Sequence, residues 1–375
     1  MKTHVPRFGF LVFLLFCVAS ANAADIKVMT QNQYLGADLA PILAAGDPGE
    51  FNAAVVVALQ KIAASSPTAR AKALAAEILK ERPALVGLQE VYEFGCIPIS
   101  GDPCSDSSIA GAFTDHLDDT LDALNGAYEV AATVVNMYIV PGVPFEIDGA
   151  LALVSVVDRD VILRRADVSA SPVDYSGICA KPSDNGCNYS EVVTASTPYG
   201  IISVERGFVA VDATVDGQAY RVVNTHLELQ YPDPSNPLSE YYQAAQAFEL
   251  WNFLAATTPS GSSLVLLGDM NSSPEHPAVI PGLPTPYQQF VTAGYTDAWM
   301  LRPGKAPEYT CCQLEDLSNQ QSALYERIDM IFSLDAPEKV KRARVVGATV
   351  SDRTPPPGLG LWPSDHGAVT AELQF

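Results

Sequence analysis

The sequence has few basic residues for its length. Its 375 residues include 22 lysines and arginines against 43 aspartates and glutamates, which gives a formal net charge of −21 at pH 7. This balance provides no basic stripe to hold a polyanion and counts against tight nucleic-acid binding, although divalent cations can offset part of the charge. Hydrophobic residues make up 48% of the chain, so a disordered protein is excluded and a large buried core is expected.

The chain also lacks internal repeats, low-complexity tracts and a Pro-, Gly- or Ser-rich linker long enough to separate two domains. Length alone would allow two domains, but single sandwich domains routinely reach about 250 residues or more. We therefore expect residues 25–375 to form a single domain and the protein to be a monomer. Two segments without motifs, near 92–148 and 174–200, are expected to be inserted loops that shape specificity.

Only one long apolar run is present, and it lies at the N-terminus. Lys2 and Arg7 precede the run FGFLVFLLFCVA, and the small residues of ANA at 21–23 provide a signal-peptidase site. The run is shorter than the roughly 20 apolar residues that a membrane anchor requires. Residues 1–24 are therefore predicted to be a cleaved signal peptide, and the mature chain to be a secreted or periplasmic protein without a transmembrane segment.

Cysteine is sparse, but the mature chain has an even number. In an oxidising compartment, six cysteines predict disulfides. Two pairs span eight positions each and would each close a loop of their own, whereas the last two are adjacent and allow a vicinal bond. The full pairing stays open. No histidine lies at ligand spacing beside a cysteine, which disfavours a zinc site. The six residues are Cys96, Cys104, Cys179, Cys187, Cys311 and Cys312.

Hydrophobic periodicity predicts a mixture of strands and helices. Apolar residues recur at helical spacing over 66–82, near 108–125 and over 239–256. Residues 208–228 alternate as a β-hairpin with Asp216 and Gly217 as its two-residue turn. The other strands are expected over residues 25–35, 84–90, 264–269, 327–333, 343–350 and 367–375.

Polar residues suited to catalysis follow the ends of these strands. The buried stretch LVLL at 264–267, for example, is followed directly by GDMN. Side chains at strand ends gather at one rim of a sheet, and carboxylates, amides and imidazoles can hold a hard divalent cation and transfer protons. Any one of them alone would be explained as a turn former, but together they predict a pocket. The set comprises Asn32, Glu90, Asn224, His226, Asp269, Asn271, Asp329, Asp365 and His366.

Six motifs in order, QNQYL, VGLQEV, VVNTHLE, LLGDMNSSP, RIDMIF and SDHGAV, carry these residues. The series resembles the endonuclease/exonuclease/phosphatase superfamily, which includes deoxyribonucleases and neutral sphingomyelinases. The resemblance covers nearly the whole mature chain. It implies an α+β fold, a four-layer α/β/β/α sandwich of two mainly antiparallel sheets flanked by helices, with the site at one edge.

The resemblance also implies a metal and a nucleophile. Glu90 would be the main ligand of a Mg²⁺ or Mn²⁺ ion, helped by Asn32 and Asp365. Asp269 would position or deprotonate the attacking water, and Asn271 would hold a phosphate oxygen.

The remaining roles concern protons and the phosphate. His366 would lie against the phosphate, oriented and kept protonated by Asp329. Either Asp269 or His366 would be the base. His226 is a candidate for protonating the leaving oxygen. The remaining candidates for contacting the phosphate are Asn224 and Arg206, the latter with a structural ion pair as the alternative.

The sequence does not decide between two classes of substrate, nucleic acids and phospholipids. A nuclease-type phosphodiesterase is the first prediction, and a sphingomyelinase-like phospholipid phosphodiesterase is the alternative. For the latter, VVNMYIVPGVPF at 134–145 would enter a lipid surface, although its pattern favours a buried strand followed by a Pro-Gly turn. No Lys/Arg cluster lies near the motifs, which disfavours an inositol phosphatase. A non-catalytic ion- or partner-binding module on the same fold is disfavoured because the motifs are intact.

Overall fold

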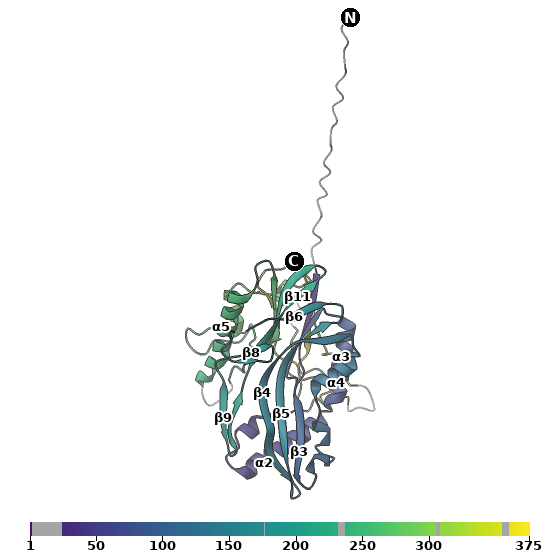
Figure 1. Ribbon diagram of the computed structural model, residues 1–375, viewed down its shortest axis with the longest axis vertical. Coiled ribbons are helices and arrows are strands. Elements are labelled where there is room, and N and C mark those ends of the chain that lie inside the picture. Colours follow the sequence, from purple (N-terminus) through teal and green to yellow (C-terminus); the bar gives the residue numbers. More distant parts are fainter. Residues whose placement is uncertain (2–24, 176, 232–236, 305–307, 355–359) are drawn as a thin grey trace.

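Two β-sheets lie face to face at the centre of the protein (Figure 1). The computed structural model describes residue 1 and residues 25–175, 177–231, 237–304, 308–354 and 360–375, so the predicted signal peptide lies outside the described residues. The first sheet has the order β16-β17-β1-β2-β5-β3, with β4 also paired to β5. Its strands are β1 (Asp25–Asn32), β2 (Leu85–Gln89), β3 (Glu93–Ser100), β4 (Tyr128–Ile147), β5 (Ala150–Arg165), β16 (Lys339–Val346) and β17 (Ala368–Gln374).

The second sheet has the order β14-β15-β13-β12-β11-β8-β7, with β6 paired to β11. Each sheet contains one parallel pair, β1–β2 and β12–β13, among antiparallel ones. A separate two-stranded sheet joins β9 (Val193–Thr197) and β10 (Gly200–Val204). The strands of the second sheet are β6 (Ser169–Pro172), β7 (Pro182–Ser183), β8 (Gly186–Asn188), β11 (Gly207–Val215), β12 (Gln218–His226), β13 (Ser263–Asp269), β14 (Thr296–Asp297) and β15 (Asp329–Ser333).

Helices cover the outer face of each sheet. In Figure 1, α3 and α4 lie on one side of the strands and α5 on the other. The α-helices are α1 (Ala40–Leu43), α2 (Pro48–Ala64), α3 (Pro67–Glu81), α4 (His116–Leu124), α5 (Glu240–Thr257), α6 (Pro286–Thr292) and α7 (Ala298–Leu301). Four single 3₁₀ turns complete them, η1 (Pro103–Ser105), η2 (Ala110–Ala112), η3 (Pro237–Ser239) and η4 (Val350–Asp352). Among the described residues, no helix is long and apolar enough to span a bilayer.

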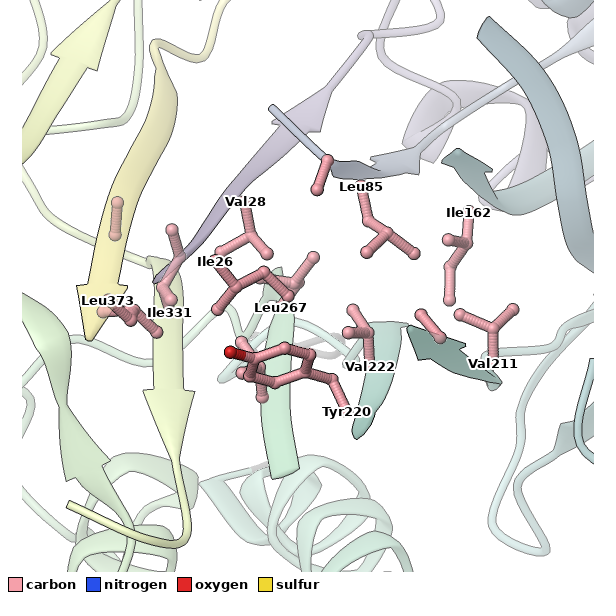
Figure 2. Packing of buried hydrophobic residues seen from close by; sticks show 14 of the residues in the cluster. Ile26, Val28, Leu85, Ile162, Val211, Tyr220, Val222, Leu267, Ile331 and Leu373 are labelled. Carbon is pink, nitrogen blue, oxygen red and sulfur yellow. The ribbon is translucent and has the colours of Figure 1, made fainter. Parts of the chain in front are cut away.

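Strand alternation builds the core in layers. Ile26 and Val28 of β1 point between the sheets, whereas Met29 points outward to the cluster that includes α3. Val222 of β12 likewise points inward, and Val223 packs outward with α5. Figure 2 shows side chains of the two sheets meeting in this central layer. The predicted four-layer sandwich of two mainly antiparallel sheets is confirmed.

Most locally encoded elements lie where the sequence predicts them. The β11–β12 hairpin turns at Asp216 and Gly217, whose φ angles of 50° and 84° suit a two-residue turn. The helix expected near 108–125 begins only at His116, because the Asp115 side chain accepts hydrogen bonds from the amides of Leu117 and Asp118 and so starts the helix there. The residues before it form η2 instead.

The segment 92–148, which is expected to be an inserted loop, forms regular secondary structure. It contains β3, α4 and β4, and β4 pairs with β5 over most of its 20 residues. The predicted Pro-Gly turn at Pro141 and Gly142 is wrong, because both residues lie within β4 as a bulge. A Cβ at Gly142 would lie 2.3 Å from the carbonyl oxygen of Val154, so only glycine allows this close approach. Residues 174–200 similarly contain β7, β8 and β9.

Three disulfides link the six cysteines of residues 25–375. Cys96–Cys104 and Cys179–Cys187 each close a short segment, with Cα atoms 5.8 and 5.9 Å apart. Cys311 is bonded to its neighbour Cys312. The two loop-closing pairs are those that the spacing suggested, and the vicinal bond is one of the alternatives that the sequence left open.

The buried carboxyl group of Glu77 on α3 is expected to lower the stability of the protein at high pH. Its carboxylate is buried and has no hydrogen-bond partner among the described residues, and burial, with repulsion from Asp352, raises its pKa to about 8. Below pH 4.5 both states are protonated. As pH rises toward 8 only the unfolded state ionises, and stability is lost. Glu77→Gln should therefore stabilise the protein at pH 8 by roughly 3 kcal/mol more than at pH 4.

Denaturant unfolding at the two pH values measures this difference. Glu146→Gln, at an exposed position on β4, is the matched control and should change stability little at either pH. An equal effect of Glu77→Gln at both pH values would contradict the assigned protonation.

Candidate active site

The predicted polar residues converge at one end of the sandwich. Parallel pairing brings the C-terminal ends of β1 and β2 together, and the same holds for β12 and β13. Because β15 and β17 run antiparallel to their neighbours, they begin at that end. Asn32, Glu90, His226, Asp269, Asp329 and His366 therefore lie at one edge formed by both sheets.

The turn after β13 explains the sequence GDMN. A Cβ at Gly268 would lie 2.2 Å from the carbonyl oxygen of Thr225 on β12, and its φ of +155° is unfavourable for other residues. The amide of Asn271 donates to Asp269 Oδ1 at 3.0 Å, and Asn271 takes a φ of 46°, which asparagine tolerates. The Asn271 side chain donates to the carbonyl oxygen of Leu227. The turn thereby aims the Asp269 carboxylate into the site.

Glu90 is held by the first sheet. Its Oε2 accepts the amide of Leu35 at 2.9 Å, and its Oε1 accepts Asn32 Nδ2 at 3.1 Å. Asn32 Nδ2 also donates to Asp269 Oδ2 at 3.0 Å, so this amide joins the carboxylates of the two sheets. The oxygen of Asn32 accepts the amide of Tyr34 at 2.9 Å. As placed, Asn32 positions Glu90 and Asp269, and metal ligation through its oxygen stays a prediction.

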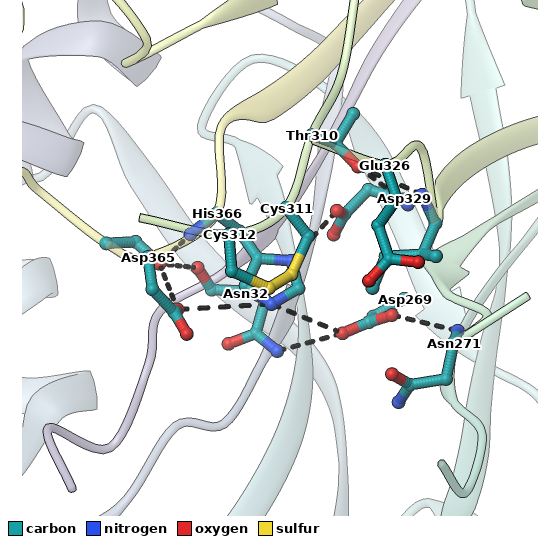
Figure 3. The surroundings of a disulfide bond; sticks show 12 residues. Asn32, Asp269, Asn271, Thr310, Cys311, Cys312, Glu326, Asp329, Asp365 and His366 are labelled. Atoms are coloured by element: carbon teal, nitrogen blue, oxygen red, sulfur yellow. Dashed lines mark hydrogen bonds and ion pairs between the residues drawn. A yellow bond between two sulfur atoms is a disulfide. The ribbon is translucent and has the colours of Figure 1, made fainter. Parts of the chain in front are cut away.

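His366 is paired with Asp329 (Figure 3). Its Nδ1 lies 2.9 Å from Asp329 Oδ2, whereas Nε2 lies 3.8 Å from Asp269 Oδ2 and 3.9 Å from Asp365 Oδ1. Burial alone would lower the pKa of His366, but the three carboxylates outweigh it and raise the pKa well above the ordinary histidine value. His366 is therefore an imidazolium at neutral pH.

His226 is in the opposite electrostatic state. Burial, reinforced by the charge of Arg206, lowers the pKa of His226 well below its ordinary value. Arg206 Nη1 lies 2.9 Å from His226 Nδ1, and because a guanidinium can only donate, Nδ1 accepts this bond. Nε2 of His226 lies 3.2 Å from Asn271 Nδ2 and 3.6 Å from Asp269 Oδ2. Arg206 also lies 3.6 Å from Glu228 Oε1, so the ion pair weighed as its alternative role is present.

The remaining carboxylates repel one another. Burial, with repulsion from Asp329, raises the pKa of Asp269 to about 7. Burial likewise raises the pKa of Asp365 to about 6, with added repulsion from Glu90. A hard divalent cation would relieve this crowding, and carboxylate oxygens are the donors it prefers. The residues present therefore fit the predicted metal, with Glu90 and Asp365 as its candidate ligands.

Of the predicted residues that do not line the cavity, which also include Asn32 and Asp329, Asn224 is the one held between the sheets. It is fully buried between the sheets, where its oxygen accepts Gln89 Nε2 at 2.6 Å and its nitrogen donates to the carbonyl oxygens of Leu88 and Val161. All its hydrogen-bonding capacity toward a phosphate is used. The structure thus corrects the predicted phosphate contact to a structural bridge between the two sheets.

This correction can be tested. Asn224→Ala leaves the Gln89 amide and two carbonyl groups without partners, so we expect a loss of about 3 kcal/mol in unfolding free energy with kcat/KM changed less than about twofold. Denaturant unfolding and steady-state kinetics below the unfolding transition measure the two effects. Asn252→Ala, on the exposed face of α5, is the control. A large fall in kcat/KM at unchanged stability would restore the phosphate role.

Two features of the site were not identified from the sequence. Gln243 of α5 is buried and its Nε2 donates to the carbonyl oxygens of Glu228 and Asn271, both at 2.7 Å, so it ties together the loops after β12 and β13. The sequence feature that could have identified Gln243 is its place, as a polar residue, on the apolar face of the predicted helix. The second is the Cys311–Cys312 wall, where Cys311 forms β-bridges with both Glu326 and His366 (Figure 3).

A cavity of about 470 Å³ opens at these residues. Glu90, His226, Asp269, Asn271 and His366 line it, together with Asp365, Arg206 and the vicinal disulfide. Arg206 is the only lysine or arginine in its lining among the described residues.

Comparisons with known proteins agree with this geometry. The sequence model of the Endonuclease/Exonuclease/phosphatase family matches residues 114–366. A comparison with curated proteins gave no match.

Several solved structures share the fold. A protein of this family from Bacteroides thetaiotaomicron matches with a TM-score of 0.54 at 15% identity, over 94% of this chain and 99% of that chain. A mannosyl-6-phosphatase from Bacteroides thetaiotaomicron VPI-5482 matches with a TM-score of 0.53 at 16% identity, over 93% and 100% of the two chains. A family protein from Leptotrichia buccalis matches with a TM-score of 0.50 at 16% identity, over 93% and 100%. At these identities the similarity shows the fold alone.

Proposed function

Because the chain belongs to the endonuclease/exonuclease/phosphatase family, whose members are phosphoester hydrolases, we propose that it is a divalent-metal-dependent phosphodiesterase with Mg²⁺ or Mn²⁺ as its cofactor. The observation that carries the proposal is the opposite charge state of two neighbouring groups. Asp269 lies 3.8 Å from an imidazolium, His366, in a cavity that opens to solvent. A buried base beside a buried acid is the arrangement that general acid–base catalysis requires.

The charge states divide the chemical roles. Asp269, with a pKa of about 7, accepts a proton from the attacking water, whose oxygen then bonds to phosphorus. The bond from phosphorus to the leaving oxygen breaks in line, and His366 gives that oxygen its proton. The raised pKa of His366 suits the role of acid better than that of base. His226, predicted as the acid, has a lowered pKa and is better suited to a hydrogen bond with a phosphate oxygen than to protonating the leaving oxygen.

Glu90 and Asp365 would hold the metal ion, which when bound neutralises phosphate charge as a Lewis acid. Asn32 holds the carboxylates of Glu90 and Asp269 close together, because its Nδ2 donates a hydrogen bond to each of them. Asn271, whose turn is fixed by Asp269, lines the same cavity, which supports its predicted contact with the phosphate. Three disulfides are compatible with the predicted secreted or periplasmic location, and we retain a monomer as the expected state.

Two substrates follow from the sequence, a nucleic acid and a phospholipid of the sphingomyelinase type. A polynucleotide needs basic groups along its path, and Arg206, the only lysine or arginine that the described part of the chain contributes to the lining, is already engaged with His226 and Glu228. The lining is otherwise largely apolar. These observations favour the phospholipid.

Hydrolysis of bis(p-nitrophenyl) phosphate by the oxidised mature protein tests the reaction class. We expect Mg²⁺- or Mn²⁺-dependent turnover that EDTA and His366→Ala both abolish. Nicking of supercoiled plasmid in parallel tests the nuclease alternative, and efficient nicking would favour that substrate over the phospholipid. A folded protein that binds Mg²⁺ yet hydrolyses no phosphodiester would instead support the non-catalytic binding module.

A further inference from the structure

The cavity does not end at the catalytic residues. It continues as a chamber between α1 and α2 on one side and β4, β5 and β10 on the other. In Figure 1 the long strands β3, β4 and β5 run together toward the end of the molecule where α2 lies. Residues that represent the chamber walls are Val55 and Leu59 of α2, Phe94 of β3, Met137 of β4, Val154 of β5 and Ile202 of β10.

The chamber is apolar throughout. The parts of its wall that come from α2, β4, β5, β9 and β10 contribute no charged or polar side chain. Apolar cavities bind apolar ligands. The whole cavity, at about 470 Å³, is within the usual range for small-molecule sites of roughly 300–1,000 Å³.

The backbone that holds the catalytic residues also forms the entrance of the chamber. Leu35, whose amide binds Glu90 Oε2, lines it, and so do Tyr92 and Phe94, which follow Glu90 in the chain. A group attached to a phosphate at Glu90 and Asp269 would therefore be directed into the chamber. The charged end and the apolar space belong to one cavity, which matches a substrate that is charged at one end only.

The outer surface of the same strands is apolar as well. On β4, Met137 and Ile139 line the chamber, whereas Tyr138 between them is 70% exposed. Ile99 of β3 and Ile201 of β10 are 55% and 73% exposed. These three are single exposed apolar side chains on three strands. Within the stretch 134–145, Met137 and Ile139 thus face the chamber and Tyr138 is exposed.

We propose that the chamber holds one long aliphatic chain of a lipid phosphodiester while its phosphate lies at the catalytic residues. The inference rests on the proposed function, and it adds that the chain enters the protein instead of remaining in the lipid surface. Affinity should then rise by up to roughly fourfold for each methylene that enters the chamber, and stop rising when the chamber is full.

Binding of butyl, hexyl and decyl phosphocholine, each below its micelle concentration and in EDTA, tests the proposal by calorimetry. Ala58→Phe adds bulk inside the chamber, and Val57→Phe adds the same bulk on the exposed side of α2. We expect Ala58→Phe to weaken decyl phosphocholine binding at least tenfold and butyl phosphocholine binding less than twofold. Val57→Phe should change neither.

Thermal unfolding checks that the variants fold, and Ile202→Phe fills the chamber from the opposite wall if Ala58→Phe does not fold. Affinity that is independent of chain length, or equal in the two α2 variants, would overturn the proposal. Adding Mg²⁺ separates the two claims. Chain-dependent binding without hydrolysis would refute the phosphodiesterase but keep the chamber, whereas hydrolysis without chain dependence would refute the chamber alone.

Discussion

Replacing His366 by alanine should lower kcat by about a thousandfold while leaving Mn²⁺ affinity within about threefold of wild type. The change removes the imidazolium that Asp329 orients at 2.9 Å, and general acid catalysis by a positioned histidine contributes about 10²–10⁴-fold. Steady-state hydrolysis of bis(p-nitrophenyl) phosphate measures kcat, and electron paramagnetic resonance of Mn²⁺ measures the affinity. Retention of more than a tenth of kcat would remove His366 from the role of acid.

Two variants sharpen the test. His276→Ala removes a histidine that pairs with Glu326 instead of with the catalytic carboxylates, and should change kcat less than about twofold. Asp329→Asn keeps the shape of the pair but removes the charge that raises the pKa of His366. The wild-type kcat should rise as pH increases through about 7, where Asp269 loses its proton, and fall where His366 loses its own. In Asp329→Asn the falling limb should move to lower pH.

Glu90→Gln should raise the Mg²⁺ concentration needed for half-maximal activity by at least about tenfold. The amide keeps one oxygen for the Leu35 N–H, so the local structure can persist, but the carboxylate charge is lost from a site that already favours a cation. At a Mg²⁺ concentration that stabilises the wild type by about 2.7 kcal/mol, a hundred times its dissociation constant, much of the stabilisation should disappear in the variant.

Thermal shift with Mg²⁺ reads out metal binding independently of turnover. Glu315→Gln, which removes an exposed carboxylate paired with Lys61, is the control and should respond to Mg²⁺ as the wild type does. Unchanged Mn²⁺ affinity in Glu90→Gln would place the metal elsewhere in the acidic cluster. Lost metal binding with full activity would favour the view that the metal is not part of catalysis.

Sequence periodicity located the strands and the order of the motifs, but it could not tell where the sandwich ends. Asn224 and His226 are two residues apart on β12, so their side chains point to the same face. Asn224 lies where the other sheet still covers that face, against Gln89, and His226 lies just beyond it. Whether a residue of β12 lies between the sheets or in the cavity depends on how far the other sheet extends, and a local sequence pattern does not predict this.

The chamber and the bulge in β4 could not be predicted from the sequence for a related reason. The apolar residues of 134–145 alternate imperfectly, and the chain could equally have turned at Pro141 and Gly142. β4 instead continues past Pro141 and Gly142, because it pairs on both sides of them with the following strand, β5. The walls of the chamber come from segments more than 100 residues apart, and the space they leave is decided by packing among them.

The register of β13 has a consequence for how the enzyme loses activity. Asp269 faces His226 on one neighbouring strand and Asp329 on the other, so the proposed base, the His226 imidazole and the partner of His366 occupy facing positions on three neighbouring strands. These residues cannot separate while the strands remain paired in the middle of the sheet. Heat inactivation should therefore accompany the loss of pairing among β12, β13 and β15 and not precede it.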